Sequence, residues 1–428
     1  MLREYDTLYE AYYDCELNKV QIWADKISER GAALLDNSES QFSLNNEQRD
    51  RKIIVSVTSI PERLEAVIYP IESMLVQTVR PDGIIIWLDK SRLSDNLLPG
   101  KLLALRKYGL EVYYVDDIGP HTKYYYAMRN FPDSFIITID DDVFYKRTLI
   151  EELLDTYKLN LNCVCAHWVW KMKFTSNGIP YPFQEFYLGQ GEAELEASHD
   201  LLALGVGGVL YPPGCLSERA FEVEAIQELA LKADDIWLKA MEILDDVKVA
   251  RVKGKYLKDP FIRNTQRTAL SIENHIGGND RTIRRVFQQF GLMRFFQKSV
   301  DSTYSKYVTI KRWFMLCQRN MQLFNYLQKR RIQTIAIYGM GEIGEMLFQN
   351  LKNSPVKVLY GIDQRAEQLH SDVPILRLEQ IHDEIDMIII TAKVDYQSIR
   401  NSLMQYVQCD VMTLDDILTE VNWYDGDF

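Results

Sequence analysis

Apolar and polar positions between residues 52 and 142 favour strands that alternate with helices. Four short apolar runs, rich in β-branched and aromatic residues, predict buried strands at 53–60, 83–91, 110–117 and 134–142. After the first run, Pro61 and helical apolar spacing as far as Leu75 predict a helix. This alternation predicts an α/β fold with a doubly wound, mostly parallel sheet, which would place ligands at the carboxyl ends of its strands.

The two ends of the chain have different patterns. Apolar residues recur near helical spacing between Leu8 and Trp23, which predicts a helical extension over residues 1–50 that packs on the next domain. From residue 332 the strand and helix pattern resumes, with predicted strands at 333–339, 356–363 and 387–393. We therefore expect an extension (1–50), a large α/β domain (51–280), a linker (281–331) and a small Rossmann-like α/β domain (332–428).

Three consecutive carboxylates end the fourth predicted strand, namely Asp140, Asp141 and Asp142. Their charges would repel one another unless a cation lies beside them. Mg²⁺ or Mn²⁺, held by one or two carboxylates and by substrate phosphates, would meet that need. A solvated acidic turn is the alternative, but the buried strand in front of the carboxylates favours a metal and diphosphate site.

Length and charge narrow the classes of function. A chain of 428 residues predicts two or three domains, and a formal net charge of -12 argues against a general nucleic-acid binder. The six cysteines form no CxxC pair, the first residues lack the apolar core of a signal peptide, and no run of about 18 apolar residues occurs. We expect a soluble cytoplasmic protein.

One segment reverses the charge balance. Residues 281–331 contain twelve Lys or Arg and a single acidic residue, Asp301, whereas residues 332–428 contain six basic and sixteen acidic residues. Basic helices with interleaved aromatic residues are typical of membrane-surface elements. The alternative is a connector whose charges pair with the acidic domains.

Five segments in a fixed order resemble bacterial nucleotide-sugar glycosyltransferases of the GT-A type, similar to the family-2 group. They are VSVTSIPER, IIIWLD, GPHTKYYYAM, ITIDDDVFY and ADDIWLKAM, and the resemblance covers roughly residues 52–290. It implies that Asp140 to Asp142 form the DxD motif, whose aspartates hold the metal that bridges the donor diphosphate. It also implies a nucleotide pocket lined by Thr58, Ser59, Arg63, Asp89 and Lys123.

Sugar transfer needs a neutralised diphosphate leaving group and a base for the acceptor hydroxyl. The resemblance favours Asp235 or its neighbour Asp234 as the base, at the start of a predicted amphipathic helix, while plain N-capping by Asp234 is the alternative. It also implies that His275 completes the metal shell, with a surface or packing role as the alternative. Flexible glycines at 205–208 would let the backbone approach the ligand closely.

A glycine-rich turn opens the C-terminal domain. Gly339, Gly341 and Gly344 in GMGEIG follow a predicted strand, and Asp363 ends the next one, where a ribose hydroxyl would be held. This dinucleotide fingerprint predicts binding of a nucleotide or NAD(P). A structural or dimerising role, which would make the protein a homo-oligomer, is the alternative.

These features predict a metal-dependent hexosyltransferase of cell-surface polysaccharide biosynthesis, acting on capsule or lipopolysaccharide. It would move a sugar, with inversion, from a UDP-linked donor to a glycan or lipid-linked glycan, at the inner face of an anionic membrane. The alternative is a nucleotide-binding regulator or an NAD(P)-dependent oxidoreductase that acts through the glycine-rich turn.

Overall fold

The computed structural model describes residues 2–14, 20–175, 178–186, 196–253, 260–262, 265, 277–296, 302–319, 322–381, 385–392 and 396–424. The chain divides into two compact units. The first comprises residues 1–172 and 186–290, and the second comprises residues 173–185 and 291–428. The boundary at residue 290 lies inside the predicted basic linker, and that linker remains a prediction.

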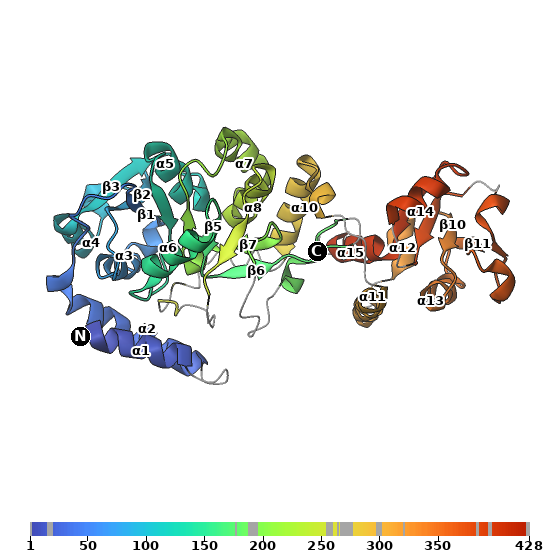
Figure 1. Cartoon of the computed structure of the whole chain (residues 1–428), viewed down its shortest axis with the longest axis horizontal. Coiled ribbons are helices and arrows are strands. Elements are labelled where there is room, and N and C mark those ends of the chain that lie inside the picture. The colour runs from blue at the N-terminus through green and yellow to red at the C-terminus, as the bar shows by residue number, and fades with distance from the viewer. Residues whose placement is uncertain are drawn as a thin grey trace. The chain divides into compact units, whose positions relative to one another are not determined.

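A seven-stranded sheet, counted over the described residues, forms the centre of the first unit (Figure 1). Its order is β3 (Leu110–Val115), β2 (Gly83–Asp89), β1 (Ile53–Thr58), β4 (Phe135–Thr138), β8 (Val209–Tyr211), β5 (Val164–Ala166) and β9 (Val249–Arg251). Strand β8 alone runs antiparallel to its two neighbours. The predicted α/β class with a mostly parallel sheet is confirmed.

Helices and a short ribbon complete this unit. The helices are α1 (Leu2–Asp14), α2 (Val20–Asp36), α3 (Ile68–Leu75), α4 (Gly100–Ala104), α5 (Thr122–Asn130), α6 (Leu149–Leu159), α7 (Val223–Leu229), α8 (Asp234–Leu244) and α10 (Asn279–Gln289). The ribbon pairs β6 (Val169–Lys171) with β7 (Leu201–Ala203). The helix predicted from Pro61 is wrong at its start, because a 3₁₀ turn over Pro61–Arg63 comes first. The segment that contains this turn places the Ser59 hydroxyl and the Arg63 guanidinium within hydrogen-bond distance of the Asp141 carboxylate, which follows β4.

The N-terminal helices α1 and α2 pack side by side (Figure 1, dark blue) and belong to the main core of the first unit. Two tyrosine hydroxyls of α1 donate hydrogen bonds to the backbone that follows the carboxylates. Tyr5 bonds to the carbonyl of Tyr145 at 2.8 Å, and Tyr9 bonds to that of Phe144 at 2.7 Å. The extension therefore fixes the loop that carries Asp140 to Asp142.

The second unit contains a parallel sheet of five strands within its described residues. The order is β12 (Ile375–Leu376), β11 (Lys357–Ile362), β10 (Thr334–Tyr338), β13 (Met387–Ile390) and β14 (Asp410–Thr413), the arrangement of a doubly wound α/β fold. Its helices are α11 (Ser302–Gln318), α12 (Leu323–Lys329), α13 (Glu342–Leu351), α14 (Tyr396–Leu403) and α15 (Leu414–Tyr424). The sequence predicted three of these strands and missed β12 and β14. Among the helices that could be described, none is long and apolar enough to cross a membrane.

Candidate active site

Arg63 neutralises two of the three consecutive carboxylates. Its Nη1 donates a hydrogen bond of 2.8 Å to Asp141 Oδ1 and lies 3.3 Å from Asp142 Oδ2. The hydroxyl of Ser59 donates to Asp141 Oδ2 at 2.6 Å. Burial raises the pKa of Asp141, although Arg63 and Ser59 oppose that shift. Arg63, in the turn after β1, thus supplies positive charge beside these carboxylates, whereas the sequence had led us to expect only a metal ion there.

Lys123 neutralises the third carboxylate. Its Nζ lies 2.6 Å from Asp140 Oδ1 and 3.2 Å from Asp234 Oδ2, so it joins the end of β4 to the start of α8. Burial, the largest single effect, lowers the pKa of Lys123, but Asp140, Asp234 and Asp235 together outweigh it and raise the pKa well above its usual value. The hydroxyl of Ser56 on β1 bonds to the backbone carbonyl of Lys123, and Trp87 Nε1 on β2 donates to that hydroxyl at 2.8 Å. Two central strands therefore fix the lysine.

The neighbouring carboxylates Asp234 and Asp235 occupy the first turn of α8. Asp235 Oδ1 accepts a hydrogen bond of 3.0 Å from the backbone N–H of Gly205. A Cβ at Gly205 would lie 3.0 Å from Lys123 Nζ and 3.3 Å from Asp235 Oδ1, so a side chain there would crowd both groups. Ala233 is the N-cap residue and makes no side-chain cap, so the N-capping alternative for Asp234 is wrong.

The environment separates the pKa values of this pair. Burial and the adjacent charge of Asp234 raise the pKa of Asp235 well above its usual value. Burial also acts to raise the pKa of Asp234, but Lys123 and His121 outweigh it and hold the value below its usual range. The two environments therefore favour the ionised form of Asp234 and make Asp235 the more basic of the two carboxylates.

Two other predicted nucleotide-pocket residues lie at strand ends and make local bonds. Thr58, the last residue of β1, donates its hydroxyl to the Trp87 carbonyl at 2.9 Å. Asp89, the last residue of β2, accepts hydrogen bonds of 2.8 and 2.7 Å from the N–H and the hydroxyl of Ser91. These bonds stabilise the turns, and the roles of both residues in nucleotide binding remain predictions.

The donor set around Asp140 fits a cation that is held mainly by substrate phosphates. Its side chain is 29% exposed, compared with 10% for Asp141 and 8% for Asp142. In the part of the chain that can be described, no three acidic, histidine or cysteine side chains converge into an all-protein metal site. His275, the predicted fourth ligand, lies outside the described residues. Mg²⁺ commonly uses only one or two carboxylates together with phosphates, so the structure is compatible with Asp140 as a ligand, and the pairing of Asp140 with Asp142 remains a prediction.

The glycine-rich turn of the second unit has the shape that its fingerprint predicts. Gly339 has φ +92°, and a Cβ there would lie 2.9 Å from the backbone nitrogen of Ala392. A Cβ at Gly344, in the first turns of α13, would lie 2.2 Å from the Gly339 carbonyl oxygen, whereas one at Gly341 would meet nothing within 4 Å. Asp363 Oδ2 accepts a hydrogen bond of 3.0 Å from the N–H of Met340 inside the turn. The aspartate therefore supports the turn, and its contact with a ribose remains a prediction.

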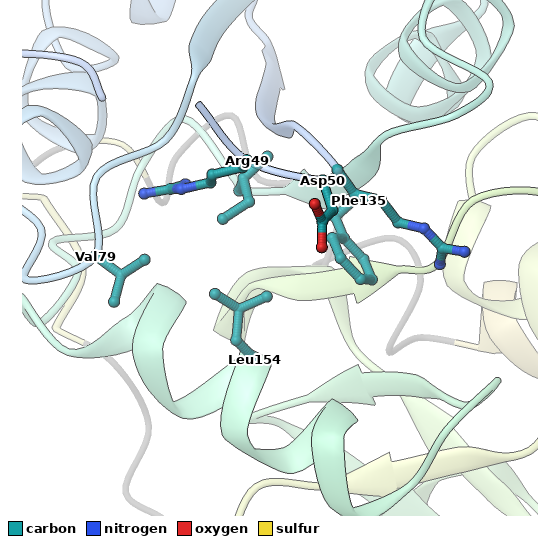
Figure 2. A pocket seen from close by; sticks show the side chains of 7 residues that line it. Arg49, Asp50, Val79, Phe135 and Leu154 are labelled. Carbon is teal, nitrogen blue, oxygen red and sulfur yellow. The ribbon is translucent and has the colours of Figure 1, made fainter. Parts of the chain in front are cut away.

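A cavity of about 350 Å³ lies at the opposite end of the central strands (Figure 2). It is lined by Arg49, Asp50, Arg51, Ile53, Val79, Phe135 and Leu154. Ile53 and Phe135 are the first residues of β1 and β4, whereas the carboxylates follow the last residue of β4. This cavity is therefore separate from the candidate active site.

Comparison with known proteins gives weak likenesses. The profile of the family described as "C2185-like, N-terminal" matches residues 331–411. No curated protein matches the chain. Residues 1–349 of TarS from S. aureus, solved in complex with UDP, are 15% identical with a TM-score of 0.33, and the match covers 48% of this chain and 59% of that one.

Two further solved structures are similar at the same level. The mannosyltransferase PcManGT from Pyrobaculum calidifontis, in complex with GDP-Man and Mn²⁺, is 12% identical with a TM-score of 0.33, covering 69% of this chain and 81% of that one. Glucosyl-3-phosphoglycerate synthase from Mycobacterium tuberculosis, in complex with Mn²⁺, UDP and glucosyl-3-phosphoglycerate, is 11% identical with a TM-score of 0.31, covering 58% and 88%. At these TM-scores none of the likenesses identifies the family of this chain.

Sequence reasoning missed three residues that shape the site. The Tyr145 hydroxyl accepts the N–H of Asp140 at 2.9 Å and donates to the Val206 carbonyl at 3.1 Å. His121 is fully buried, with Nε2 2.8 Å from the Ala230 carbonyl just before α8, and burial lowers its pKa. Ser56 holds Lys123 through its backbone. Tyr145 and His121 lay inside recognised motifs, but nothing in their spacing indicated these partners.

Proposed function

We propose that the first unit transfers a glycosyl group from a nucleotide-sugar donor to a hydroxyl of an acceptor glycan. One observation carries this proposal: Lys123 gathers Asp140 from the end of β4 and Asp234 from the start of α8, with Asp235 beside them. Carboxyl ends of parallel strands are the usual ligand position in such sheets. Cation-binding carboxylates next to a carboxylate base are the groups that sugar transfer requires.

The charge balance of this cluster supports a metal-dependent reaction. Asp140, Asp141, Asp142 and an ionised Asp234 carry four negative charges, while Arg63 and Lys123 together supply two positive ones. An anionic diphosphate would be repelled from this surplus unless another cation were present. Asp140 and Asp142 would hold Mn²⁺ or Mg²⁺, and the ion would neutralise charge on the leaving diphosphate as a Lewis acid.

Asp235 is the residue that we assign as the base. It is partly exposed, whereas Asp234 is buried and tied to Lys123. Its raised pKa makes it the stronger base of the pair once it is ionised, and the N–H of Gly205 fixes the orientation of its carboxylate. It would take the proton of the acceptor hydroxyl during direct displacement, which inverts the anomeric configuration. Asp234 would stay ionised and position Lys123.

Donor and acceptor are finer parts of the proposal. The resemblance of the motifs favours a UDP-linked hexose as donor and a cell-surface or lipid-linked glycan as acceptor. The second candidate function is nucleotide or NAD(P) binding by the second unit, either for regulation or for oxidoreduction. It is supported by the parallel strand order and by the open space around Gly341 at the start of α13.

The experiment is donor hydrolysis and transfer by the full-length chain, measured over a panel of nucleotide sugars with Mn²⁺, with Mg²⁺ and with EDTA. We expect metal-dependent turnover with one class of donor. Asp235→Asn should lower kcat by about 10²- to 10⁴-fold with little change in donor affinity, because the base acts in the transition state. A product that retains the anomeric configuration would contradict the single-base scheme.

Two variants test whether donor binding depends on the carboxylate cluster of the first unit. Asp140→Asn should abolish metal-dependent donor binding, while Asp133→Asn, an exposed carboxylate just before β4, should behave as wild type. Nucleotide binding that persists in Asp140→Asn and disappears when Gly341 is replaced by a bulkier residue would assign it to the second unit. The transferase proposal would then fail.

A further inference from the structure

Helix α11 in the second unit carries apolar side chains on its outward face. Among its described side chains, Ile310, Phe314 and Met315 are 38%, 61% and 44% exposed. Lys311 is exposed beside them, and the exposed Arg319 follows the last residue of the helix. Exposed apolar residues scattered singly need no explanation, but three within two turns of one helix form a patch. We call these five residues the α11 outer face.

The opposite side of α11, over the residues whose side chains are described, packs into the core of its own unit. Trp313 and Leu316 are buried, and the helix packs against α15. Arg312 is 4% exposed, donates to the Thr419 hydroxyl at 2.8 Å and stacks on the ring of Tyr181 at 4.1 Å. Because these contacts fix the rotation of the helix, the outer face cannot turn inward. Arg312 is therefore a structural cation, not a surface one.

The charge around this face selects an anionic partner. Lys311 and Arg319 are exposed at the face, and residues 302–331 contain no acidic residue. Apolar side chains flanked by cations suit the boundary between headgroups and acyl chains, where the apolar groups leave water and the cations meet phosphate. A purely polar acidic surface would match the cations but would leave Phe314 and its apolar neighbours exposed to water.

Helix α10, the other half of the predicted basic segment, does not offer the same surface. Its apolar residues Ile283, Val286 and Phe287 are buried, and the helix packs against α7 and α8 of the first unit. The apolar face of α10 is therefore already covered by protein and cannot enter a bilayer. We therefore expect membrane contact from α11 and not from the whole of residues 281–331.

We propose that the α11 outer face binds the surface of an anionic lipid bilayer, with Ile310, Phe314 and Met315 entering the interface and Lys311 and Arg319 facing lipid phosphates. This proposal is independent of the sugar-transfer chemistry, because no residue of the face belongs to the first unit. It also requires no membrane-spanning segment, since the helix would lie in the plane of the interface.

The test is co-sedimentation of the full-length protein with vesicles of phosphatidylcholine alone and of phosphatidylcholine with phosphatidylglycerol, at low and high salt. We expect binding to the anionic vesicles that weakens with salt. The variant I310S/F314S/M315S should bind about tenfold or more weakly, because each lost apolar side chain reduces the buried area. The matched control is L159S/L161S, which removes two leucines that are 73% and 66% exposed in the first unit.

A second measurement reports the position of the helix. Cys317 is exposed on α11, so a polarity-sensitive fluorophore can be attached there after Cys15, Cys215 and Cys409 are changed to serine and only the buried Cys163 and Cys165 remain besides it. Its emission should shift to the blue with anionic vesicles and stay unchanged with neutral ones. Unfolding midpoints equal to that of wild type would show that the variants are folded. Absence of wild-type binding at low salt, or equal binding of the triple variant and its control, would overturn the proposal.

Discussion

At the scale of single residues, the site is a network in which each cation serves two carboxylates. Arg63 lies between Asp141 and Asp142, and Lys123 lies between Asp140 and Asp234. A cation shared in this way cannot be removed without leaving two negative charges partly unpaired, at least one of them buried. We infer that these pairs hold the cluster together before any ligand binds.

The pH dependence of stability tests whether burial raises the pKa of Glu72. Glu72 is 1% exposed on α3, its Oε1 lies 3.0 Å from Lys101 Nζ, and burial raises its pKa to about 7 from 4.5. The folded state therefore binds more protons than the unfolded state between these values, so stability must fall as pH rises. From pH 5 to 8 we expect this group to remove up to about 3 kcal/mol of stability.

The measurement is the urea midpoint of wild type, Glu72→Gln and Glu65→Gln at both pH values. Glu72→Gln should lose less stability than wild type between pH 5 and pH 8, because an amide does not ionise. Glu65 is exposed on the same segment, and its replacement should leave the pH dependence of wild type intact. The same loss in all three proteins would mean that Glu72 is not the group that titrates.

At the scale of elements, the sequence predicted the strands that have an apolar pattern of their own. It missed the strands that form only by pairing with a neighbouring strand. Strands β1, β2 and β4 were predictable because each is a mostly apolar run, rich in β-branched residues, with a largely buried pattern. Strand β12 has two residues and β14 reads DVMT, so neither carries a periodic signal. Such edge strands form because they hydrogen-bond to the backbone of a neighbouring strand, β11 or β13. The residues of the edge strand alone do not indicate this pairing.

The same limit applies to the candidate site. The rule that ligands gather at carboxyl ends of parallel strands anticipated that the residues after β1 and β4 would come close together. It did not identify Arg63 and Lys123 as the cations for the carboxylates, because an ion pair depends on side-chain direction. Nor did it indicate that the N–H of Gly205 would orient Asp235.

The glycine-rich turn before α13 yields a prediction about an element. Gly344→Ala should destabilise the second unit by about 1–3 kcal/mol, because the new Cβ would overlap the Gly339 carbonyl oxygen at 2.2 Å. Gly341→Ala places its Cβ in open space and should leave stability within about 0.5 kcal/mol of wild type. Thermal unfolding of the two variants checks this. Equal destabilisation would show that the turn is packed differently.

At the scale of the whole molecule, each compact unit has an apolar core of its own. Ile137 on β4 belongs to the core of the first unit, and Ile389 on β13 belongs to that of the second. A large core in each unit predicts that each can unfold as a cooperative block.

Calorimetry of the full-length chain should therefore resolve two transitions. Ile389→Ala should destabilise one transition by about 2–5 kcal/mol, and Ile137→Ala should destabilise the other by a similar amount, because each change leaves a cavity in a separate core. If each substitution moved both transitions together, the chain would unfold as a single block.

The N-terminal helices impose an order of events on synthesis of the chain. The Tyr5 hydroxyl reaches a backbone carbonyl 140 residues later, and the Ser28 hydroxyl on α2 reaches the Phe261 carbonyl 233 residues later. Helices α1 and α2 therefore leave the ribosome before the segments that they contact, and the bond from α2 to Phe261 cannot form until the 233 residues after Ser28 have been made. Contacts of such long range slow folding and leave an apolar surface uncovered while translation continues. Chaperones that bind nascent chains would therefore have a long opportunity to bind α1 and α2.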